Sequence, residues 1–323
     1  MSQRFIVGDA IDVLGGLGRA SVELCCTSPP FLGLRDYLDD EREVGTEETP
    51  GEYLDHLLAV VAALAPVLTL DGSLAWELGD TFADSGGAGG DYGPGGNREG
   101  QPRWKQRRPE QGERRTVSDG NRPGGHHSGG NGWPLGKSLC LIPQLFAASL
   151  AYGRNMLTGE ESPAGRWRIR NFICWARTNP TPGAVGDKLR TGTSYITVAC
   201  RERQRYWDPT AVANEGDDGR FVPALDWIHP EFTWVLPNSS GPRSPVYNPE
   251  REHEHFAVWP EELARRLILA MCPPGGTVLD PFCGTATTLA AAQGVGRQGI
   301  GIDLDPRNEE LAREKVGMYL EVP

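Results

Sequence analysis

The stretch Val278-Leu279-Asp280-Pro281-Phe282-Cys283-Gly284-Thr285-Ala286-Thr287-Thr288 decides the fold. An apolar strand runs into an acidic residue, then into a turn of small residues, and then into a helix expected over Ala286–Gln293. The next expected strand, Gly299–Asp303, also ends in an acid, twenty-three residues after Asp280. A strand–helix–strand unit with an acid at the tip of its second strand is typical of nucleoside binding, because that acid can hold the ribose hydroxyls.

The turn after Asp280 also indicates the charge of the ligand. It lacks the several glycines that let a backbone approach a pyrophosphate, and the acid stands where a dinucleotide would bring negative charge. A nucleoside that carries positive charge is therefore favoured. S-Adenosylmethionine (SAM), with its ammonium and sulfonium groups, fits. An ordinary strand–helix junction without a ligand is the alternative interpretation.

Strand and helix patterns alternate on the amino-terminal side of this unit and continue after it. We expect strands at Phe5–Val7, Val22–Cys26, Ser73–Leu78, Asn171–Trp175, Ser194–Val198 and Thr277–Asp280. We expect helices at Gly51–Leu68 (ended by Pro66), Leu139–Tyr152, Glu261–Met271 and Asn308–Met318. This alternation predicts an α/β fold with a mostly parallel sheet covered by helices.

A second loop, Thr27-Ser28-Pro29-Pro30-Phe31, follows one of the expected strands. Its two prolines remove two backbone donors and hold the chain extended. Ser28 Oγ and the Pro29 carbonyl then form a pair of acceptors beside the face of Phe31. Such a site suits the exocyclic amine of a planar base, because drawing on its N–H bonds frees the nitrogen lone pair to attack a methyl group. A proline-stiffened turn is the alternative for this loop taken alone.

Together the two loops resemble the β-type DNA amino-methyltransferases, which methylate N4 of cytosine or N6 of adenine with SAM. The family's (S/D/N)PP(Y/F) signature corresponds to Ser28–Phe31, and its DPFxGxGTT cofactor loop corresponds to Asp280–Thr288. The catalytic motif comes first in the chain, which is the permuted β-type order. Gly8–Ala10 is similar to the GD loop at the adenine end of the cofactor, and His255–Leu263 is similar to the HFAxFPEEL segment that walls the cofactor pocket.

The resemblance implies a Rossmann-like methyltransferase fold, with helices on both faces of the sheet and a circularly permuted motif order. It implies catalytic roles for Ser28, Pro29, Pro30 and Phe31. It implies cofactor binding by Asp9, Ala10, His255, Phe256, Asp280, Pro281, Phe282, Gly284, Thr285, Thr287, Asp303 and Leu304. It implies no metal.

Three positions depart from the family pattern. Ala286 replaces the usual glycine of the cofactor loop, so we expect its Cβ to lie close to the methionine end of the cofactor. Phe31 replaces the commoner tyrosine, which keeps the stacking face but loses a hydroxyl. Trp259 stands where phenylalanine is more typical.

Serine at position 28 resembles N4-cytosine enzymes more than adenine enzymes, which more often carry aspartate. We therefore predict a site-specific DNA (cytosine-N4)-methyltransferase, with N6-adenine methylation as the alternative. A cytosine-C5 enzyme would need a cysteine nucleophile, typically in a Pro-Cys pair, and the chain has only the reverse order, Cys272-Pro273. A non-catalytic DNA-binding protein with a degenerate cofactor loop stays open. RNA and protein-glutamine methylation are disfavoured, the latter because such relatives carry Asn at position 28.

The 323 residues carry a net charge of −11, which taken as an average argues against a nucleic-acid partner. The average conceals opposite segments: residues 164–205 hold nine Lys/Arg against two acids, residues 98–122 hold eight against four, and residues 36–55 hold nine acids against one base. We expect the two basic segments to face the phosphates of double-stranded DNA, with a solvated surface that makes no DNA contact as the alternative for the shorter segment, 98–122. The DNA contacts predicted are Arg35, Arg166, Arg168, Arg170, Arg177, Lys188 and Arg190.

Other partners and the location follow from composition and resemblance. No apolar run is long enough to cross a bilayer and no secretory leader is visible, so a soluble cytoplasmic protein without membrane contact is expected. A homodimer and a cognate restriction endonuclease are the protein partners that the resemblance leaves open. The seven cysteines include no CxxC pair, which favours buried reduced thiols over a zinc site.

Two nucleotide-binding motifs are rejected on context. Gly294–Gly299 matches GxGxxG, but a helix precedes it and a strand follows, so it is read as a helix-to-strand turn. Gly136-Lys137-Ser138 has Asn131 where a P-loop needs its first glycine, and no strand precedes it. Nucleoside-triphosphate hydrolysis is therefore not expected.

Five regions are expected along the chain. Residues 1–83 form the catalytic half, 84–136 a mobile insertion with 16 of the 42 glycines, and 137–200 the rest of the catalytic half. Residues 201–250 form the target-recognition region, and 251–323 form the SAM-binding half.

Overall fold

A nine-stranded sheet forms the centre of the protein. In this computed structural model, residues 2–33, 40, 42–83, 132–176, 189, 191–215, 221–222, 227–228 and 259–322 are described. The strand order is β11-β1-β10-β9-β2-β3-β5-β4-β8. The strands are β1 (Gln3–Val7), β2 (Val22–Thr27), β3 (Leu68–Leu78), β4 (Arg168–Ala176), β5 (Thr193–Cys200), β8 (Trp227–Ile228), β9 (Thr277–Asp280), β10 (Gln298–Asp303) and β11 (Leu320–Glu321). A separate pair joins β6 (Asn214–Glu215) to β7 (Phe221–Val222).

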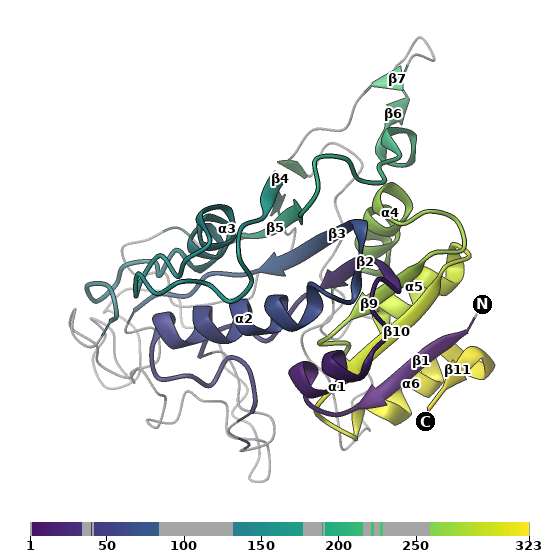
Figure 1. Ribbon diagram of the computed structural model, residues 1–323, viewed down its shortest axis with the longest axis horizontal. Helices are drawn as coiled ribbons and strands as arrows, with labels where there is room; N and C mark the ends of the chain where they lie inside the picture. Colours follow the sequence, from purple (N-terminus) through teal and green to yellow (C-terminus); the bar gives the residue numbers. More distant parts are fainter. Residues whose placement is uncertain are drawn as a thin grey trace, which may run out of the picture.

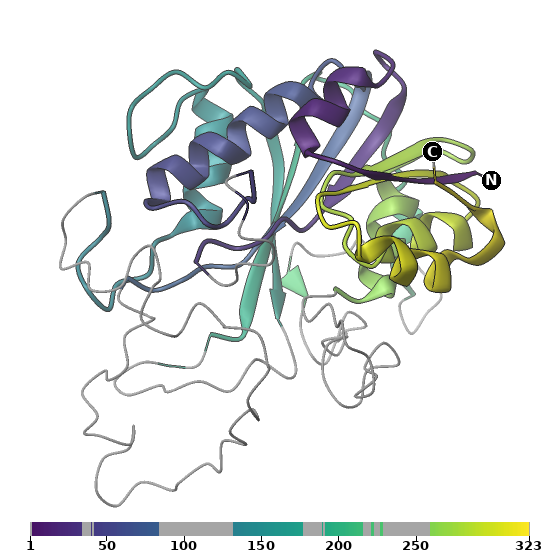
Figure 2. The ribbon, with the colours of Figure 1, turned by 90° about the horizontal axis from the view of Figure 1, so that it is seen from below.

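Neighbouring strands of this sheet are parallel except where β5 pairs with β3 and β4. The prediction of a mostly parallel sheet is confirmed. Helices α1 (Ala10–Gly16), α2 (Pro50–Leu64) and α3 (Ile142–Tyr152) cover one face, and α4 (Glu261–Met271), α5 (Thr287–Gly294) and α6 (Asn308–Val316) cover the other (Figures 1 and 2). Short 3-10 turns, Pro209–Val212 and Gly317–Tyr319, complete the described elements.

Side chains of β2 alternate between the two faces, as a buried parallel strand requires. Cys25 packs with α1, α2 and α3, whereas Leu24 and Cys26 pack with α4 and α5. Six of the seven cysteines are buried as free thiols, and Cys174 is half-buried. Within the described residues, no helix is both long and apolar enough to cross a membrane.

Element bounds agree with the sequence closely in some places and differ in others. Strand β9 and helix α4 match the expected ranges, and Gly294–Gly299 is the expected helix-to-strand turn. Strand β3 begins at Leu68 rather than Ser73, so Asp71-Gly72, a pair of residues typical of turns, lies inside the strand. A register irregularity opposite Val22 and Leu24 accommodates those extra residues.

The chain segments that flank the expected insertion, 84–136, pair with each other beside the end of β3. Phe82 bridges Leu139, and the Cys140 N–H donates to the Thr81 carbonyl at 2.9 Å. Leu139 is therefore extended, and α3 begins three residues later than expected. Residues 84–131 lie outside the described residues. Of the expected insertion, residues 132–136 are described, and there Trp133 is buried and its Nε1 donates to the Glu48 carbonyl at 2.8 Å.

Candidate active site

Five neighbouring parallel strands bring the predicted motifs to one edge of the sheet. In the order β1, β10, β9, β2, β3 their carboxyl ends lead into Gly8-Asp9, Leu304, Pro281, Ser28 and Gly79-Asp80. Motifs that are far apart in the chain therefore lie side by side (Figure 1). Ligands of open α/β sheets bind outside this edge, so the fold itself marks the candidate site.

The hydroxyl of Ser28 is oriented by a buried acid. Ser28 Oγ donates to Glu77 Oε2 at 2.5 Å, and Glu77 on β3 is only 2% exposed. A hydroxyl has one proton and two lone pairs, so donation to Glu77 leaves Ser28 Oγ free to accept from a substrate N–H. Glu77 is not among the site residues predicted from the sequence, although a carboxylate inside the apolar run Ser73–Leu78 is a visible signal.

Helix α2 braces the two prolines from behind. The Tyr53 hydroxyl donates to the Pro30 carbonyl at 2.8 Å, and the Tyr53 side chain is fully buried. The helix begins with a capping box between Thr49 and Glu52, which fixes the first turn from which Tyr53 projects. The catalytic loop is thus attached to a rigid element.

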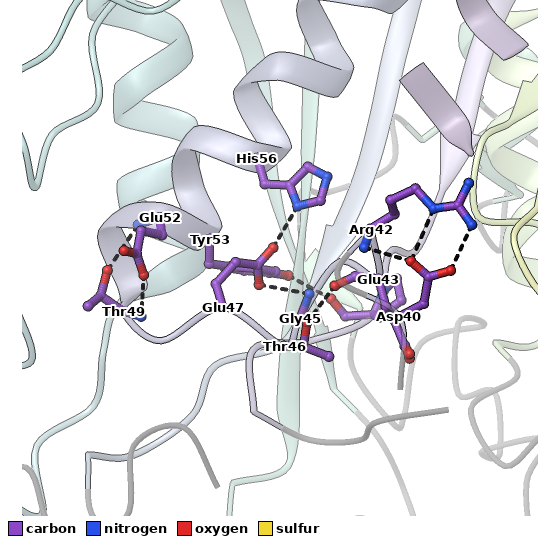
Figure 3. Close-up of polar contacts among 11 residues, drawn as sticks. Asp40, Arg42, Glu43, Gly45, Thr46, Glu47, Thr49, Glu52, Tyr53 and His56 are labelled. Carbon is purple, nitrogen blue, oxygen red and sulfur yellow. Dashed lines mark hydrogen bonds and ion pairs between the residues drawn. The ribbon is translucent and has the colours of Figure 1, made fainter. Parts of the chain in front are cut away.

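A second support comes from the acidic segment that precedes α2. Gly45 accepts from the Gly33 N–H at 2.8 Å and has φ +98, and a Cβ there would lie 3.0 Å from the Phe31 carbonyl oxygen. Glu47 holds this glycine in place, because its carboxylate accepts from the Gly45 N–H at 2.8 Å and lies 2.7 Å from His56 Nδ1 (Figure 3). Glu47 therefore supports the loop instead of facing open solvent.

The ring of Phe31 packs on the backbone of Gly79. A Cβ at Gly79 would come within 2.5 Å of Phe31 Cε2, so only glycine fits beneath the ring. The next residue, Asp80, accepts from the Leu141 N–H at 3.0 Å and the Ile142 N–H at 3.2 Å and so caps α3. Burial raises the pKa of Asp80 above its ordinary value.

Asp280 joins the cofactor loop to the catalytic loop. Its carboxylate accepts from Thr27 Oγ1 at 2.6 Å and from Thr288 Oγ1 at 2.5 Å, and Thr27 directly precedes Ser28. Burial raises the pKa of Asp280 to about 6, although the two hydroxyl donors and the Phe282 N–H lower it. The Phe282 ring meets Trp76 edge-on, with centroids 6.0 Å apart, which links the same loop to β3.

Asp303 organises the neighbouring loops. It accepts from the Gly284 N–H at 2.7 Å and from Asn308 Nδ2 at 2.9 Å, and its carbonyl accepts from the Gly8 N–H at 2.9 Å. Burial raises the pKa of Asp303 to about 6. Asp9 caps α1 by accepting from two of its N–H groups. Three of the acids predicted for the cofactor site are therefore brought to one edge.

Thr285 and Thr287 face inward. Lys315 of α6 donates to the Thr285 hydroxyl at 2.6 Å and to the Thr287 hydroxyl at 2.7 Å, and both threonines are buried. Between them Ala286 has φ +62, and its side chain is fully buried in a cluster with Cys283 and Leu289. The expectation that its Cβ faces the cofactor is therefore wrong, because the methyl group points into the core beneath α6.

The predicted DNA contacts are not gathered at this edge. Arg168 pairs with Cys200, which pairs with Ser73 in the middle of β3, five residues before the carboxyl end of that strand, so Arg166, Arg168 and Arg170 lie away from the edge of the sheet that holds Ser28. The Arg168 guanidinium also donates to the Arg201 carbonyl. Arg35, Arg177, Lys188, Arg190, His255 and Phe256 lie outside the described residues.

The donor set at the cofactor edge fits SAM. Asp303 is half-buried beside the Gly8 backbone, a position from which a carboxylate can accept from ribose hydroxyls. The N-cap of α5 makes no side-chain hydrogen bond to the first turn, so the helix offers backbone N–H groups to a carboxylate. The acids Asp280 and Asp303 suit the positive charges of the ammonium and sulfonium groups.

Comparison with known proteins gives consistent results. A family model described as DNA methylase (N6_N4_Mtase) matches residues 22–314. The Type II methyltransferase M.Cfr9I of Citrobacter freundii is 30% identical over 94% of this chain and 84% of its own, and M.SmaI of Serratia marcescens is 27% identical over 98% and 91%. The fold is similar to that of PvuII DNA (cytosine-N4)-methyltransferase, with a TM-score of 0.62 at 14% identity, covering 98% of this chain and 86% of that one. It is also similar to a Thermus thermophilus protein assigned as a DNA modification methylase and solved with SAM, with a TM-score of 0.52 at 23% identity and 99% of each chain covered.

Proposed function

We propose that this protein methylates cytosine N4 at a specific DNA site. The chain belongs to the DNA methylase family whose members modify N6 of adenine or N4 of cytosine, and it uses SAM as methyl donor. The observation that carries the proposal is the Ser28–Glu77 hydrogen bond of 2.5 Å at the end of β2. It leaves the serine oxygen as a neutral acceptor, where adenine enzymes of this kind more often carry aspartate. The similarity in fold to the PvuII cytosine-N4 enzyme supports the same choice.

The first step of the proposed mechanism is capture of a flipped cytosine. The amine is paired inside a duplex, so the base must leave the stack before it can react. Phe31, whose ring packs against Gly79, provides the stacking face. Ser28 Oγ and the Pro29 carbonyl accept the two N–H bonds of the amine, and this draws the nitrogen lone pair out of conjugation and toward the cofactor edge.

The second step transfers the methyl group and removes a proton. Bound SAM would supply an electrophilic methyl group, whose bond to sulfur would break as its bond to nitrogen forms, leaving S-adenosylhomocysteine. As the nitrogen–carbon bond forms, the amine nitrogen becomes positively charged and must lose one hydrogen. Ser28 Oγ accepts that proton while its own proton passes to Glu77 Oε2, so the positive charge of the amine is neutralised by the buried Glu77 carboxylate. Preorganised acceptors of this kind stabilise developing charge without solvent reorganisation.

The test separates catalysis from binding. Ser28→Ala is expected to lower kcat on genomic DNA by roughly 100-fold, within the range that general base catalysis contributes, with the Kd for SAM within about twofold of wild type. Glu77→Gln is expected to lower kcat to a similar degree, because it cannot take the proton. Ser21→Ala, at an exposed serine that bonds only its own turn, is the matched control. Equal loss of SAM binding and of turnover in Ser28→Ala would refute the assigned role.

The biological setting is also proposed here. The named relatives are Type II methyltransferases, which supports a cognate restriction endonuclease as partner and a cytoplasmic location. We assign target recognition to residues 201–250, of which the described part includes the turn Pro209–Val212 packed on α4. A homodimer is a further proposal, which sedimentation of the purified protein tests directly.

A further inference from the structure

Two unusual features of the cofactor loop occur at the same place. The first is Ala286, a residue with a side chain at φ +62, where the family pattern has glycine. The population of this left-handed conformation is roughly tenfold lower for a residue with a Cβ than for glycine. The second is Lys315, whose amine lies beneath the loop with its hydrogen bonds directed to neutral hydroxyls.

The lysine holds the residues on either side of the alanine. Its Nζ lies 2.6 Å from Thr285 Oγ1 and 2.7 Å from Thr287 Oγ1, so a single group joins the two neighbours of Ala286. Fixing these two side chains restricts the turn between them. The Ala286 methyl is locked from the same side by its packing with Cys283 and Leu289.

Burial of the charged Lys315 amine destabilises the folded protein, because the amine loses its hydration. Burial lowers the pKa of Lys315 to about 8, although the Cys283 thiol of the loop and the Glu261 carboxylate of α4 act to raise it. A charge retained in such a place needs a reason other than packing, because an apolar side chain of similar length would avoid the desolvation.

We propose that Lys315 is a positioning residue for SAM binding, which clamps Thr285 and Thr287 and so holds Ala286 in the left-handed conformation that the cofactor loop requires. The proposal rests on the proposed assignment of Asp280–Thr288 as that loop. Glycine would adopt this conformation unaided, whereas Ala286 needs the two lysine hydrogen bonds to hold it there. Without those hydrogen bonds only a fraction of the molecules would have a loop that can bind SAM, and the apparent affinity would fall in proportion to that fraction.

A double-mutant cycle tests the clamp. Lys315→Met is expected to raise the Kd for SAM, measured by calorimetry, about tenfold, and to raise KM for SAM similarly with kcat within about twofold of wild type. Ala286→Gly alone is expected to change Kd by less than about twofold. In the Ala286→Gly background, Lys315→Met is expected to raise the Kd for SAM by no more than about twofold, because glycine adopts the left-handed turn without the lysine.

Controls keep the outcomes distinct. Arg313→Met, on the same helix at an exposed residue paired with Glu309, is expected to leave Kd unchanged. Lys315→Gln repeats the test if the methionine variant fails to fold, and thermal melting identifies that case. Wild-type affinity in Lys315→Met, or an equal loss in both backgrounds, overturns the clamp. Wild-type affinity in Asp280→Asn would instead overturn the assignment of the cofactor loop.

Discussion

Gly79 lies directly beneath the ring that the proposed mechanism uses to stack the target base. In Gly79→Ala the new methyl would lie 2.5 Å from Phe31 Cε2, so the ring must tilt away. A displacement of about 1 Å costs roughly 100-fold in a positioned reaction, and we expect a loss of that size in kcat/KM for DNA. SAM affinity, measured by calorimetry, is expected to stay within about twofold of wild type.

Gly15 provides the control for that substitution. It lies in α1, where an added Cβ meets no atom within 4 Å, so Gly15→Ala is expected to keep full activity. If Gly79→Ala also kept full activity, Phe31 would not be the stacking surface.

Asp280 gives the free energy of unfolding a characteristic pH dependence. Its folded-state pKa of about 6 lies above the ordinary 3.8, so the folded protein binds this proton more tightly than the unfolded chain does. The resulting stabilisation is present below about pH 4 and is lost as the pH rises through about 6. The loss is of order 3 kcal/mol for a shift of about two units.

Asp280→Asn removes the part of the pH dependence of the unfolding free energy that comes from Asp280 and leaves the part that comes from Asp303. Relative to wild type, the variant is expected to gain stability between pH 4 and pH 7 in urea unfolding without ligand. The exposed Asp71→Asn variant should show no such trend. A difference between Asp280→Asn and wild type that stays constant across this range would contradict the assigned pKa.

At the scale of elements, α2 is expected to influence catalysis through one hydroxyl. Tyr53→Phe keeps the buried ring but removes the 2.8 Å hydrogen bond to the Pro30 carbonyl. We expect a loss of about 1 kcal/mol in unfolding free energy and a fall in kcat of roughly tenfold as the proline loop loosens. Tyr152→Phe, at an exposed tyrosine at the end of α3, should change neither quantity. Unchanged kcat in Tyr53→Phe would show that the prolines alone hold the loop.

Elements with strong local signals could be predicted from sequence, whereas those that depend on neighbours could not. The apolar stripe of α4 and the turn residues around β9 set bounds that match the structure. Helix α1 has only seven residues and ends in two glycines, so its stability depends on the Asp9 cap and on packing against α2. Strand β3 runs through Asp71-Gly72 because a partner strand accommodates the irregularity, which no local pattern reveals.

The site shows the same division between local and tertiary information. Both loops could be predicted because each is a continuous motif. Glu77 on β3 contacts the catalytic loop, and Lys315 on α6 contacts the cofactor loop. Both residues are distant in sequence from the loops that they contact, so only the structure reveals their roles. Glu77 left a weak trace, since it is a charged residue among apolar neighbours in a buried strand, whereas Lys315 lies in a helix rich in charged residues and left none.

At the scale of the whole molecule, the distribution of charge predicts how the protein binds DNA. Arg170 lies on β4, and its guanidinium reaches the carbonyl of exposed Arg203 at 3.3 Å. Arg170 lies away from the edge of the sheet that holds Ser28, so these arginines contact DNA only where the duplex extends beyond the candidate site. We expect such contacts, and replacing both arginines by glutamine should reduce the slope of log K against log salt by about one per lost phosphate contact. Arg313→Gln on α6 is the control. An unchanged slope would mean that these arginines only brace the 201–205 segment.

The identity of the methylated base tests the central claim most directly. Purified protein is incubated with unmethylated genomic DNA and SAM carrying a labelled methyl group, and the DNA is digested to nucleosides and separated by mass spectrometry. The proposed function predicts label in N4-methyldeoxycytidine, which accumulates roughly 100-fold more slowly when Ser28→Ala replaces the wild type. Label in N6-methyldeoxyadenosine, or no labelled nucleoside under any condition, would contradict it.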